Sequence, residues 1–596
     1  MRCTSGGPGH RNRNTNGLTS ETTESGEGSA SDEPQSSEEN RRADERDHQI
    51  GGGDRRNIDL AYDPWNTLAS FSRQNWGFDM VAGLQDRVAA RGEQLALVDE
   101  FASYTWSEFN TRQNRLVHGL RGLGLGVGDT IALLGNNRHE WIETLSASGL
   151  IGTVLVPVNW HFSVDEIAYV LQNSGATALV ADAEFSEHAA AAAELAGVPT
   201  RVSYGGPITG FTDFEEVVAS GSPDEPIGEV AGGTMFYTSG TTGRPKGVKS
   251  NLLAVGGDPS EMTDKLRLLL SLYLMPEPDG NVVLCNAPLY HAGPLAFCGI
   301  PFTLGATMVL RRKWDGEETL DLIDRYSVTH YYAVPTHFSR MLKLPQAIKD
   351  TFSGASLQYA LHTAAPCPPA VKRQMIDWWG PVIFELYGAS EGGGCGTAVN
   401  SEDWLSKPGT VGTPTPVTEL LIIGDDGARL GPNEVGQIYM RSLIGIDFEY
   451  LGDEEKTKGA HLEPGVFSFG DVGYVDDDGY LFLSDRKIDM IISGGVNIYP
   501  AEIESVIVTH PSVADVGVFG VPNDEFGEEV KAAVELLAGA DPVEVEADLR
   551  RLCREKLAGY MCPRSYDFGA LPRTATGKLP KRELRAKYWE GAGRSI

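Results

Sequence analysis

The sequence predicts an α/β fold, and three patterns lead to that prediction. From about residue 60 to about residue 400, short apolar runs rich in β-branched residues alternate with helical stretches. From about residue 409 to about residue 484, short strands are separated by Gly and Asp turns, which is typical of hairpins. After Asp489, a compact segment mixes helices with strands. We therefore expect a large region with parallel sheets, a β-rich part and a small α+β domain.

The apolar runs of the first region are nearly continuous, as in parallel strands that are buried on both faces. The expected strands are Ile131–Leu134, Thr153–Val158, Ala178–Ala181, Val282–Cys285, Thr307–Leu310, His330–Val334 and Val382–Leu386. Helices are expected between several of these strands, for example at Trp106–Leu123 and Val164–Gln172. This alternation favours parallel sheets that are covered by helices on both faces.

The uncharged stretch of residues 284–310 is the best candidate for a membrane span, but it contains several prolines. A lipid-facing helix would tolerate Pro288, Pro294 and Pro301 poorly. A strand, a loop and a buried helix explain this stretch better, so we expect no transmembrane segment.

The sequence also predicts individual elements in the β-rich part and in the last segment. The turn Asp476–Gly479 predicts a hairpin within the β-rich part. The expected elements of the last segment are the helices Pro500–Thr509 and Pro542–Leu557 and the strands Val516–Phe519 and Val530–Leu537. We expect a disordered tail at 1–58, a large domain at 59–485 with its β-rich subdomain at 408–485, and a C-terminal domain at 489–596.

Composition excludes some partners and points to a compartment. The 596 residues include 82 acidic and 50 basic side chains, so the formal net charge is −32. This charge argues against nucleic acid and against a basic patch on an anionic membrane, because both need concentrated Lys and Arg. The N-terminal tail has too few aliphatic side chains to fold and lacks the apolar core of a signal peptide. Seven scattered cysteines without a C-x-x-C pair favour reduced thiols, and we expect a cytoplasmic protein.

The most informative stretch is Tyr237–Gly247, which predicts a loop that binds phosphate. It contains three glycines, four hydroxyl side chains, one Arg and one Lys. Glycines let backbone N–H groups approach an anion, hydroxyls donate to phosphate oxygens, and cations neutralise them. The candidate phosphate ligands are Thr238, Ser239, Gly240, Thr241, Thr242, Gly243 and Lys246. The loop is not a Walker A motif, because neither Gly243 nor Gly247 is followed by Lys and then Ser or Thr. From composition alone, a flexible Gly/Thr surface hairpin remains an alternative.

The stretch Y-T-S-G-T-T-G-R-P-K-G resembles the phosphate-binding signature of the adenylate-forming superfamily, in its acyl-CoA synthetase branch. Four further segments match that superfamily in the expected order. They are Pro288–His291, Tyr387–Glu391, Gly470–Gly473 with Asp485–Arg486, and Leu571–Lys578. The resemblance covers roughly residues 60 to 590. It implies two parallel-type sheets with helices, a small β-barrel-like subdomain, and a small mobile C-terminal domain.

The resemblance also implies a two-step reaction that uses ATP, Mg²⁺ and coenzyme A. A carboxylate attacks the α-phosphate of ATP to give acyl-AMP and pyrophosphate, and a thiol then displaces AMP. By similarity, Lys578 bridges the substrate carboxylate and the α-phosphate, where two anions must meet. Glu391 resembles the Mg²⁺ ligand, since a hard cation prefers carboxylate oxygen. His291 resembles the residue that positions the substrate beside the thiol tunnel.

The remaining matches imply a nucleotide site and a thiol loop. Tyr387 offers an aromatic face to adenine, and Glu385 could accept a hydrogen bond from the adenine amine. Asp471 and Arg486 match the residues that bind the ribose from its two sides. The other implied ligands are Ala364, Ala365 and Pro366 beside adenine, Gly388 and Ser390 in the Tyr387–Glu391 motif, and Gly494 and Gly495 beside the pantetheine arm.

The family implies that the C-terminal domain rotates between the two half-reactions. It would present Lys578 for adenylation and the Gly495 loop for thioester formation. The hinge position, where the family usually has Asp or Lys, is Ile488 here, with Asp489 beside it. Because of this departure, an enzyme that is efficient at only one half-reaction remains an alternative.

Several other functions are weighed against a ligase that uses coenzyme A. A ligase that loads an acyl carrier protein is the second choice, and a homodimer is left open. A more distant alternative is an α/β-hydrolase, because Gly388–Gly392 reads G-x-S-x-G with Ser390 as the nucleophile. An amino-acid-activating domain is disfavoured, because Pro288–Pro294 offers no Asp to pair a substrate ammonium group. A binding protein without catalytic activity is disfavoured because the chemistry-bearing positions are filled.

The substrate pocket is expected between four segments of the large domain. These are His291–Thr303, Tyr331–Phe338, His362–Ala365 and Ala389–Thr397. No Lys or Arg is obvious there for a second carboxylate. The glycines at 392–394 either enlarge the pocket or serve backbone geometry alone. We expect a small-molecule acid, either a medium-to-long fatty acid or a bulky alicyclic or terpenoid acid.

Overall fold

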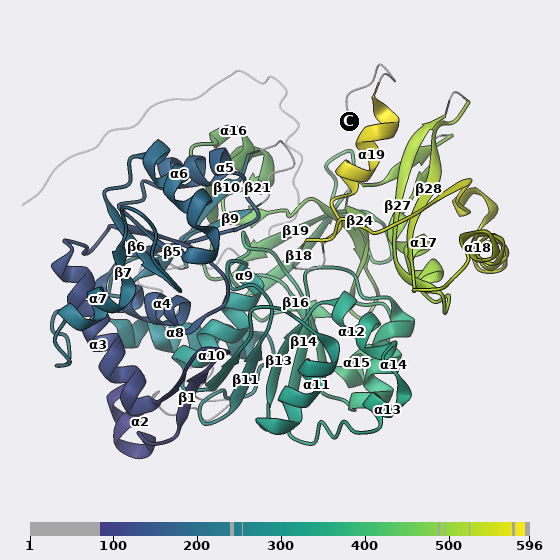
Figure 1. Cartoon of the computed structure of the whole chain (residues 1–596). Coiled ribbons are helices and arrows are strands. Elements are labelled where there is room, and N and C mark those ends of the chain that lie inside the picture. The colour runs from purple at the N-terminus through teal and green to yellow at the C-terminus, as the bar shows by residue number, and fades with distance from the viewer. Residues whose placement is uncertain are drawn as a thin grey trace, which may run out of the picture. The chain divides into compact units, whose positions relative to one another are not determined.

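The computed structural model describes residues 84–238, 244–252, 254–486, 489–494, 496–523, 525–574 and 578–590. The expected tail at 1–58 lies outside the described residues. No helix in the described part of the chain is long and apolar enough to cross a membrane. The chain has an α/β architecture with parallel sheets and helices, as the sequence predicts (Figure 1).

The first sheet has six strands in the order β7-β6-β5-β3-β4-β8, all parallel. Its strands are β3(Thr130–Leu134), β4(Val154–Val158), β5(Ala178–Asp182), β6(Thr200–Tyr204), β7(Thr212–Asp213) and β8(Gly233–Thr234). The helices α5(Val164–Asn173) and α6(Ser186–Ala196) pack on one face. The helices α3(Trp106–Gly122), α4(His139–Ile151) and α7(Phe214–Ser220) pack on the other face. Both faces are buried, which explains the continuous apolar runs.

The second sheet has nine strands in the order β17-β16-β15-β14-β13-β11-β12-β1-β2. Its strands are β1(Leu95–Val98), β2(Ser103–Thr105), β11(Val282–Cys285), β12(Thr307–Leu310), β13(His330–Ala333), β14(Tyr359–His362), β15(Ile383–Tyr387), β16(Thr397–Val399) and β17(Thr413–Pro414). The strands from β15 to β1 are parallel, and β2, β16 and β17 add antiparallel edges.

Helices cover both faces of this second sheet as well. The helices α11(Gly316–Arg325), α12(Pro335–Leu342) and α14(Pro369–Trp379) share one apolar core with it. On the other face lie α8(Pro259–Leu272) and a helical stretch made of α9(Ala292–Pro294), the π-helical turn η2(Leu295–Gly299) and α10(Ile300–Thr303). The uncharged run at 284–310 is therefore a strand, a loop, a largely buried helix and a second strand.

The β-rich part is an open sheet rather than a barrel. The strands β18(Thr418–Ile423), β19(Gly436–Ser442), β21(His461–Glu463), β22(Val466–Phe467), β23(Asp471–Val475) and β24(Leu481–Arg486) form it. The predicted hairpin at Asp476–Gly479 joins β23 and β24. Among the described strands, no ladder joins the two ends of this sheet, so the expected barrel-like closure is wrong. A separate three-stranded sheet contains β9(Phe236–Thr238), β10(Lys246–Ser250) and β20(Phe448–Tyr450).

The last part of the chain has its own sheet and its own core. The strands β25(Ile491–Ser493), β26(Val496–Ile498), β27(Val513–Asn523), β28(Gly527–Leu536) and β29(Ser565–Phe568) form this sheet. The helices α17(Pro500–Ile507) and α18(Pro542–Lys556) share its main apolar core, and α19(Lys581–Trp589) packs beside β27. The mixture of helices and mainly antiparallel strands agrees with the α+β pattern of the sequence.

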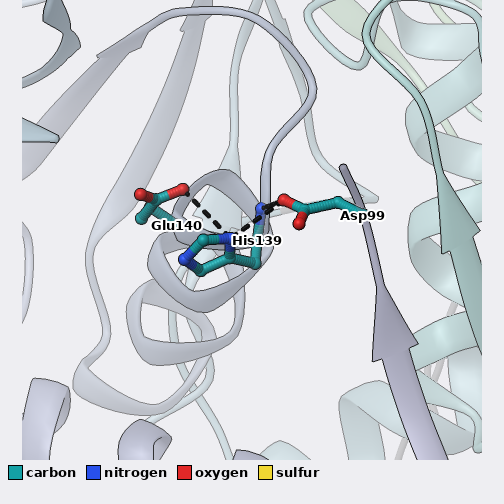
Figure 2. Close-up of side chains that lie close together, drawn as sticks. All are labelled: Asp99, His139 and Glu140. Atoms are coloured by element: carbon teal, nitrogen blue, oxygen red, sulfur yellow. Dashed lines mark hydrogen bonds and ion pairs between the residues drawn. The ribbon is translucent and has the colours of Figure 1, made fainter. Parts of the chain in front are cut away.

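Three buried side chains, Asp99, His139 and Glu140, connect β1 with the N-terminus of α4 (Figure 2). Oδ2 of Asp99 accepts hydrogen bonds from the backbone N–H of His139 at 2.8 Å and from its Nδ1 at 2.9 Å. Glu140 is paired with both guanidinium arms of Arg138 at 3.0 and 2.9 Å. Burial opposes a charged imidazole, but the neighbouring carboxylates outweigh burial and raise the pKa of His139. Because protein groups already satisfy these atoms, the cluster has a structural explanation and requires no metal ion.

Candidate active site

The candidate site lies at the carboxyl ends of parallel strands in the second sheet. His291 follows β11 and is the residue before α9, and Ala364–Pro366 follow β14. Gly388, Ser390 and Glu391 follow β15, which ends in Tyr387. Ligands of open parallel sheets bind at this edge, because the loops that follow neighbouring strands converge there. Ala364 has a φ of 75°, a conformation that costs a non-glycine residue about 1–3 kcal/mol and is typical of functional loops.

Two candidate nucleotide ligands from distant segments touch each other. The hydroxyl of Tyr387 donates a hydrogen bond to Oδ2 of Asp471 at 2.7 Å. Asp471 begins β23, and its partner across the antiparallel ladder is Arg486 at the end of β24. Tyr387, Asp471 and the backbone of Arg486, three of the candidate nucleotide ligands, are therefore neighbours.

The two ends of the predicted phosphate loop are paired in one hairpin. Thr238 at the end of β9 lies opposite Lys246 at the start of β10. The intervening candidates Ser239, Gly240, Thr241, Thr242 and Gly243 lie outside the described residues. Lys246 therefore lies at the base of the hairpin formed by β9 and β10.

Tyr450 connects this hairpin with Glu391, and sequence reasoning missed it. It lies on β20 next to β10, and its hydroxyl donates a hydrogen bond to Oε1 of Glu391 at 3.0 Å. The Nζ of Lys246 lies 5.7 Å from the centre of the Tyr450 ring. Burial, together with the Glu391 carboxylate, raises the pKa of Tyr450 far above its usual value, so the phenol stays a donor. This hydrogen bond restrains the orientation of Glu391 beside β20.

The fit of Glu391 to a magnesium ion can be judged from its chemistry. Mg²⁺ is usually held by one or two carboxylates together with phosphate oxygens of the substrate. Glu391 is a carboxylate that contacts Tyr450 of β20, the neighbour of β10, and Tyr450 occupies only one of its two oxygens among the described contacts. The residues present therefore fit a magnesium ion shared with a bound nucleotide.

Lys578 and His291 line the same cavity. Lys578 is exposed, and its backbone N–H donates to Oγ1 of Thr574 at 3.1 Å. The Nε2 of His291 is buried and has no hydrogen-bond partner within the described structure. Burial, assisted by the positive charge of Lys578 and by His161, lowers the pKa of His291 to about 3. His291 is thus neutral at physiological pH.

The cavity that these residues line has a volume of about 670 Å³ and mainly apolar walls. This volume is within the range of about 300–1,000 Å³ for small-molecule sites. Each of the four expected segments contributes to its wall, at His291–Phe297, Tyr332, Thr363–Ala364, Ala389–Ser390 and Gly393–Gly394 among others. The helices α3 and α8 also line it, and sequence reasoning did not name them. Gly394 lines it with a φ of 121°, and a Cβ there would lie 2.8 Å from Leu269, so both explanations of this glycine apply.

Comparison with known proteins identifies the family. The model of the AMP-binding enzyme family matches residues 84–444, and the model of the AMP-binding enzyme C-terminal domain matches residues 502–578. The chain belongs to the AMP-binding enzyme family. It is therefore an enzyme of the adenylate-forming type, as the motifs indicate.

Relatives of known activity cover most of the chain. A fatty acid–[acyl-carrier-protein] ligase of Streptomyces coeruleorubidus is 31% identical over 84% of this chain and 95% of its own length. A long-chain-fatty-acid–CoA ligase of Mycobacterium tuberculosis is 32% identical over 81% of this chain and 93% of its own length. The o-succinylbenzoate CoA synthetase of Bacillus subtilis, solved with its acyl-adenylate intermediate, superimposes with a TM-score of 0.69. It is 28% identical over 84% of this chain and 97% of its own.

Within this AMP-binding enzyme, Glu385 has a partner that sequence reasoning missed. Lys372 of α14 is fully buried, and its Nζ lies 2.6 Å from Oε2 of Glu385. The His362 ring lies 3.5 Å from the same oxygen. Burial raises the pKa of Glu385, and Lys372 opposes that rise. The contact with adenine expected of Glu385 stays a prediction, and its carboxylate is already engaged in an ion pair.

The position of Lys372 could have been found from the sequence. The buried residues of α14 are Val371, Lys372, Met375, Ile376 and Trp379, which lie on one helical face. A lysine within an apolar stripe must have a buried acidic partner, since an unpaired buried charge is too costly. Which carboxylate lies opposite depends on β15, and the sequence has no local signal for that.

The hydrolase alternative does not agree with the fold around Ser390. A nucleophile elbow lies in a sharp turn between a strand and a helix. Here β15 is followed by turns and then by β16, which pairs antiparallel with β15. No helix follows Ser390 in this described stretch, so the G-x-S-x-G match at 388–392 is not a nucleophile elbow.

Four further candidates lie between residues 486 and 495. Gly494 forms the turn between β25 and β26 with a φ of 59°, and its N–H donates to the carbonyl of Phe526 at 2.8 Å. Gly495 and the hinge candidate Ile488 lie outside the described residues. The side chain of Arg486 is likewise not described.

The structure corrects one statement about charge in the substrate pocket. Arg87 of α2(Leu84–Arg91) lines the cavity, although no arginine was obvious there from the sequence. Its Nη1 donates to the carbonyl of Thr303 at 2.9 Å, and its Nε lies 3.9 Å from Oδ1 of Asp279. Arg87 therefore ties α2 to the end of α10.

Proposed function

We propose that this protein is an acyl-CoA ligase that activates a hydrophobic carboxylic acid with ATP. It forms acyl-AMP and pyrophosphate, and then transfers the acyl group to the thiol of coenzyme A with release of AMP. One observation carries this proposal. A single cavity with mainly apolar walls extends to Lys578, His291 and the Gly388–Ser390 loop, beside the Tyr387–Asp471 pair.

The first step requires positive charge, because the substrate carboxylate and the α-phosphate repel each other. Lys578 supplies that charge at the cavity wall, and Lys246 and Thr238 hold the phosphates at the base of the hairpin. The neutral ring of His291 lines the acid site without adding charge, and it orients the carboxylate toward Lys578. Tyr387 and Asp471 bind the adenosine part.

Glu391, held by Tyr450, binds the Mg²⁺ ion. When bound, this ion neutralises phosphate charge and draws electrons from the phosphoryl oxygens. The other phosphate-loop residues act as ligands through their hydroxyls and backbone N–H groups. The adenine edge is lined by Ala364–Pro366 and Glu385.

The acid is a medium-to-long fatty acid or a bulky alicyclic or terpenoid acid. The apolar walls of the cavity and its volume of about 670 Å³ support this class. The fatty-acid ligases among the relatives support it as well. Turnover of only small acids, such as acetate or benzoate, would exclude this substrate class.

The second step uses the C-terminal part of the chain. We propose domains at 59–485 and 489–596, and a rotation of the second domain about residues 488–489. This rotation exchanges Lys578 for the Gly494–Gly495 turn at the reaction centre. Coenzyme A is the proposed acceptor, and an acyl carrier protein is the second candidate because one relative is a fatty acid–[acyl-carrier-protein] ligase.

The deciding experiment follows nucleotide products with the purified full-length protein. ATP, Mg²⁺, a series of acids and either coenzyme A or a phosphopantetheine-loaded carrier protein are supplied separately. The expected products are AMP, pyrophosphate and acyl-CoA. Release of ADP, or ester hydrolysis without ATP, would refute the proposal.

A further inference from the structure

Lys578 belongs to a chain segment that packs on one face of strand β27. A small apolar core joins this segment to the sheet, and it consists of Phe519, Val521, Ala533, Leu571, Leu584 and Tyr588. Residues two positions apart on a strand lie on the same face, so Asp515 and Gly517 share the face of Phe519. The main core with α17 and α18 lies on the opposite face, at Val516 among others. The face that supports Lys578 is therefore separate from the main core.

The loop before Lys578 is closed by two hydrogen bonds between its ends. The N–H of Thr574 donates to the carbonyl of Lys578 at 2.8 Å, and the N–H of Lys578 donates to Oγ1 of Thr574 at 3.1 Å. The residues between them, 575–577, lie outside the described residues. Because the two ends of the loop are joined, a contact that fixes the chain at Thr574 also fixes the backbone of Lys578.

Arg573, which precedes Thr574, joins this loop to β27 through an ion pair with Asp515. The Nε of Arg573 pairs with Oδ2 of Asp515, and its Nη2 donates to Oδ1 at 2.8 Å. The same Nη2 donates to the carbonyl of Val516 at 3.3 Å. Asp515 is only 8% exposed. A guanidinium group and a carboxylate that meet through two bonds fix each other's direction as well as their distance. Asp515 thus anchors the loop before Lys578.

On the other side of Lys578, the side chain of Leu579 packs against the backbone of Gly517. A Cβ at position 517 would lie 2.2 Å from Cδ2 of Leu579 and 3.4 Å from Cδ1 of Leu584. Two carbon atoms in contact prefer a separation of about 3.5–4.0 Å, so any larger residue at 517 would displace Leu579. The φ of Gly517 is outside the left-handed region, so the need for space explains this glycine. Gly517 thus admits the residue that directly follows Lys578.

The chemistry assigned to Lys578 depends on its exact place. A lysine carries its charge on a flexible four-carbon chain, and this one is exposed, so only the backbone beneath it can be fixed. A misplacement of about 1 Å in a reacting constellation can cost about 10² in rate. One anchor before Lys578 and one after it restrict the backbone from both sides.

We infer that Asp515 and Gly517 of β27 are positioning residues for Lys578. Asp515 acts through Arg573 on the loop before the lysine, and Gly517 provides the space for Leu579 after it. This inference rests on the proposed function, in which Lys578 serves adenylation and is exchanged for another turn before thioester formation. Both positioning residues therefore matter for the first half-reaction and not for the second.

The test measures each half-reaction of the full-length protein separately. Asp515→Asn weakens the ion pair, and Gly517→Ala displaces Leu579. Each should lower the rate of acyl-AMP formation from ATP and acid by roughly tenfold to a hundredfold. Each should leave thioester formation from supplied acyl-AMP and coenzyme A unchanged. Adding Leu579→Val to Gly517→Ala should restore much of the adenylation rate. Valine lacks the clashing Cδ2, and the Cγ of Leu579 lies 3.6 Å from the added Cβ, which is an ordinary contact distance.

A double-mutant cycle with Lys578→Ala distinguishes positioning from a general structural role. In the Lys578→Ala background, Asp515→Asn should cause no further loss of adenylation, because the charge that it positions is already absent. Val545→Ala is the control for destabilisation alone. Val545 is a buried residue of α18 in the main core, on the opposite face of the sheet. This variant should lower thermal stability without changing the ratio between the two half-reactions.

Three results would overturn the inference and leave the proposed function intact. They are unchanged adenylation in Asp515→Asn and Gly517→Ala, equal loss of both half-reactions, and a full additional loss in the Lys578→Ala background. Gly517→Ala and its rescue by Leu579→Val do not involve the ion pair, so they decide the matter even if Asp515→Asn fails to fold. By contrast, a wild-type protein that forms no acyl-AMP with any acid would refute the proposed function itself, and the inference with it.

Discussion

The hydroxyl of Tyr387 donates a 2.7 Å hydrogen bond to Asp471, a residue 84 positions further along the chain. Tyr387 ends β15 of the nine-stranded sheet, and Asp471 begins β23 of the β-rich sheet. The bond therefore joins two sheets at the candidate nucleotide site. It fixes the Tyr387 ring and the Asp471 carboxylate, the two side chains expected beside adenine and ribose, relative to each other.

Tyr387→Phe should weaken nucleotide binding by removing this bond. A hydrogen bond to a charged group is worth about 1.5–3 kcal/mol, so KM for ATP should rise at least roughly tenfold. The aromatic face is retained, so kcat should change less than KM. A double-mutant cycle with Asp471→Asn measures the coupling. Strictly additive effects on KM would show that the two side chains act independently.

Lys578→Ala should abolish adenylation and largely spare thioester formation. Removing one charge that stabilises the transition state costs roughly 10²–10³ in rate. Each half-reaction is assayed alone, with ATP and acid in one case and with supplied acyl-AMP and coenzyme A in the other. Equal loss in both assays, in a variant with unchanged thermal stability, would contradict the role assigned to Lys578.

Glu391→Gln should raise the Mg²⁺ concentration needed for half-maximal adenylation, because an amide is a weaker ligand for a hard cation than a carboxylate. Tyr450→Phe should produce a smaller shift in the same direction, since it removes only the bond that orients Glu391. Titration of Mg²⁺ at fixed ATP measures both effects. An unchanged Mg²⁺ dependence in Glu391→Gln would exclude this residue as the metal ligand.

Lys372→Met should destabilise the fold by about 3–5 kcal/mol, because it leaves the Glu385 carboxylate buried without its cation. The double variant with Glu385→Leu should recover much of that loss. Lys249→Met is a matched control, because Lys249 and Glu449 form an exposed pair at 3.0 Å that is worth less than about 1 kcal/mol. Urea unfolding measures the free energy of unfolding of these three variants. Similar losses of stability in Lys372→Met and Lys249→Met would contradict a stabilising buried pair between Lys372 and Glu385.

The stability of the enzyme should fall as the pH is lowered from about 6.5, and His291 should contribute to this fall. Burial lowers the pKa of His291 to about 3, below its unfolded value of 6.5. The unfolded chain therefore takes up a proton before the native chain does, so this stability is present above pH 6.5 and is lost toward pH 3. His291→Phe should flatten the slope, whereas the exposed control His188→Gln should not. Denaturant unfolding across this pH range checks the prediction, and an unchanged slope in His291→Phe would contradict it.

Local patterns in the sequence were enough to predict the fold class and the order of the elements. Continuous apolar runs predicted β3, β4 and β5, because strands buried on both faces have no polar side to interrupt them. The turn at Asp476–Gly479 predicted the hairpin of β23 and β24 for a similarly local reason. The motifs around Lys246, Glu391 and Lys578 likewise indicated the chemistry, since each carries its residues within a few positions.

Contacts between distant segments could not be predicted in this way. Lys372 meets Glu385, Tyr450 meets Glu391 and Tyr387 meets Asp471 because sheets and helices pack in three dimensions, and no local pattern encodes these pairs. The same holds for the cavity, whose wall brings together residues of α3, α8 and α10. Side-chain periodicity specifies which face of an element is buried, but packing alone specifies what that face meets. The motifs therefore indicate the reaction class, whereas the shape and polarity of the substrate site depend on how the elements pack.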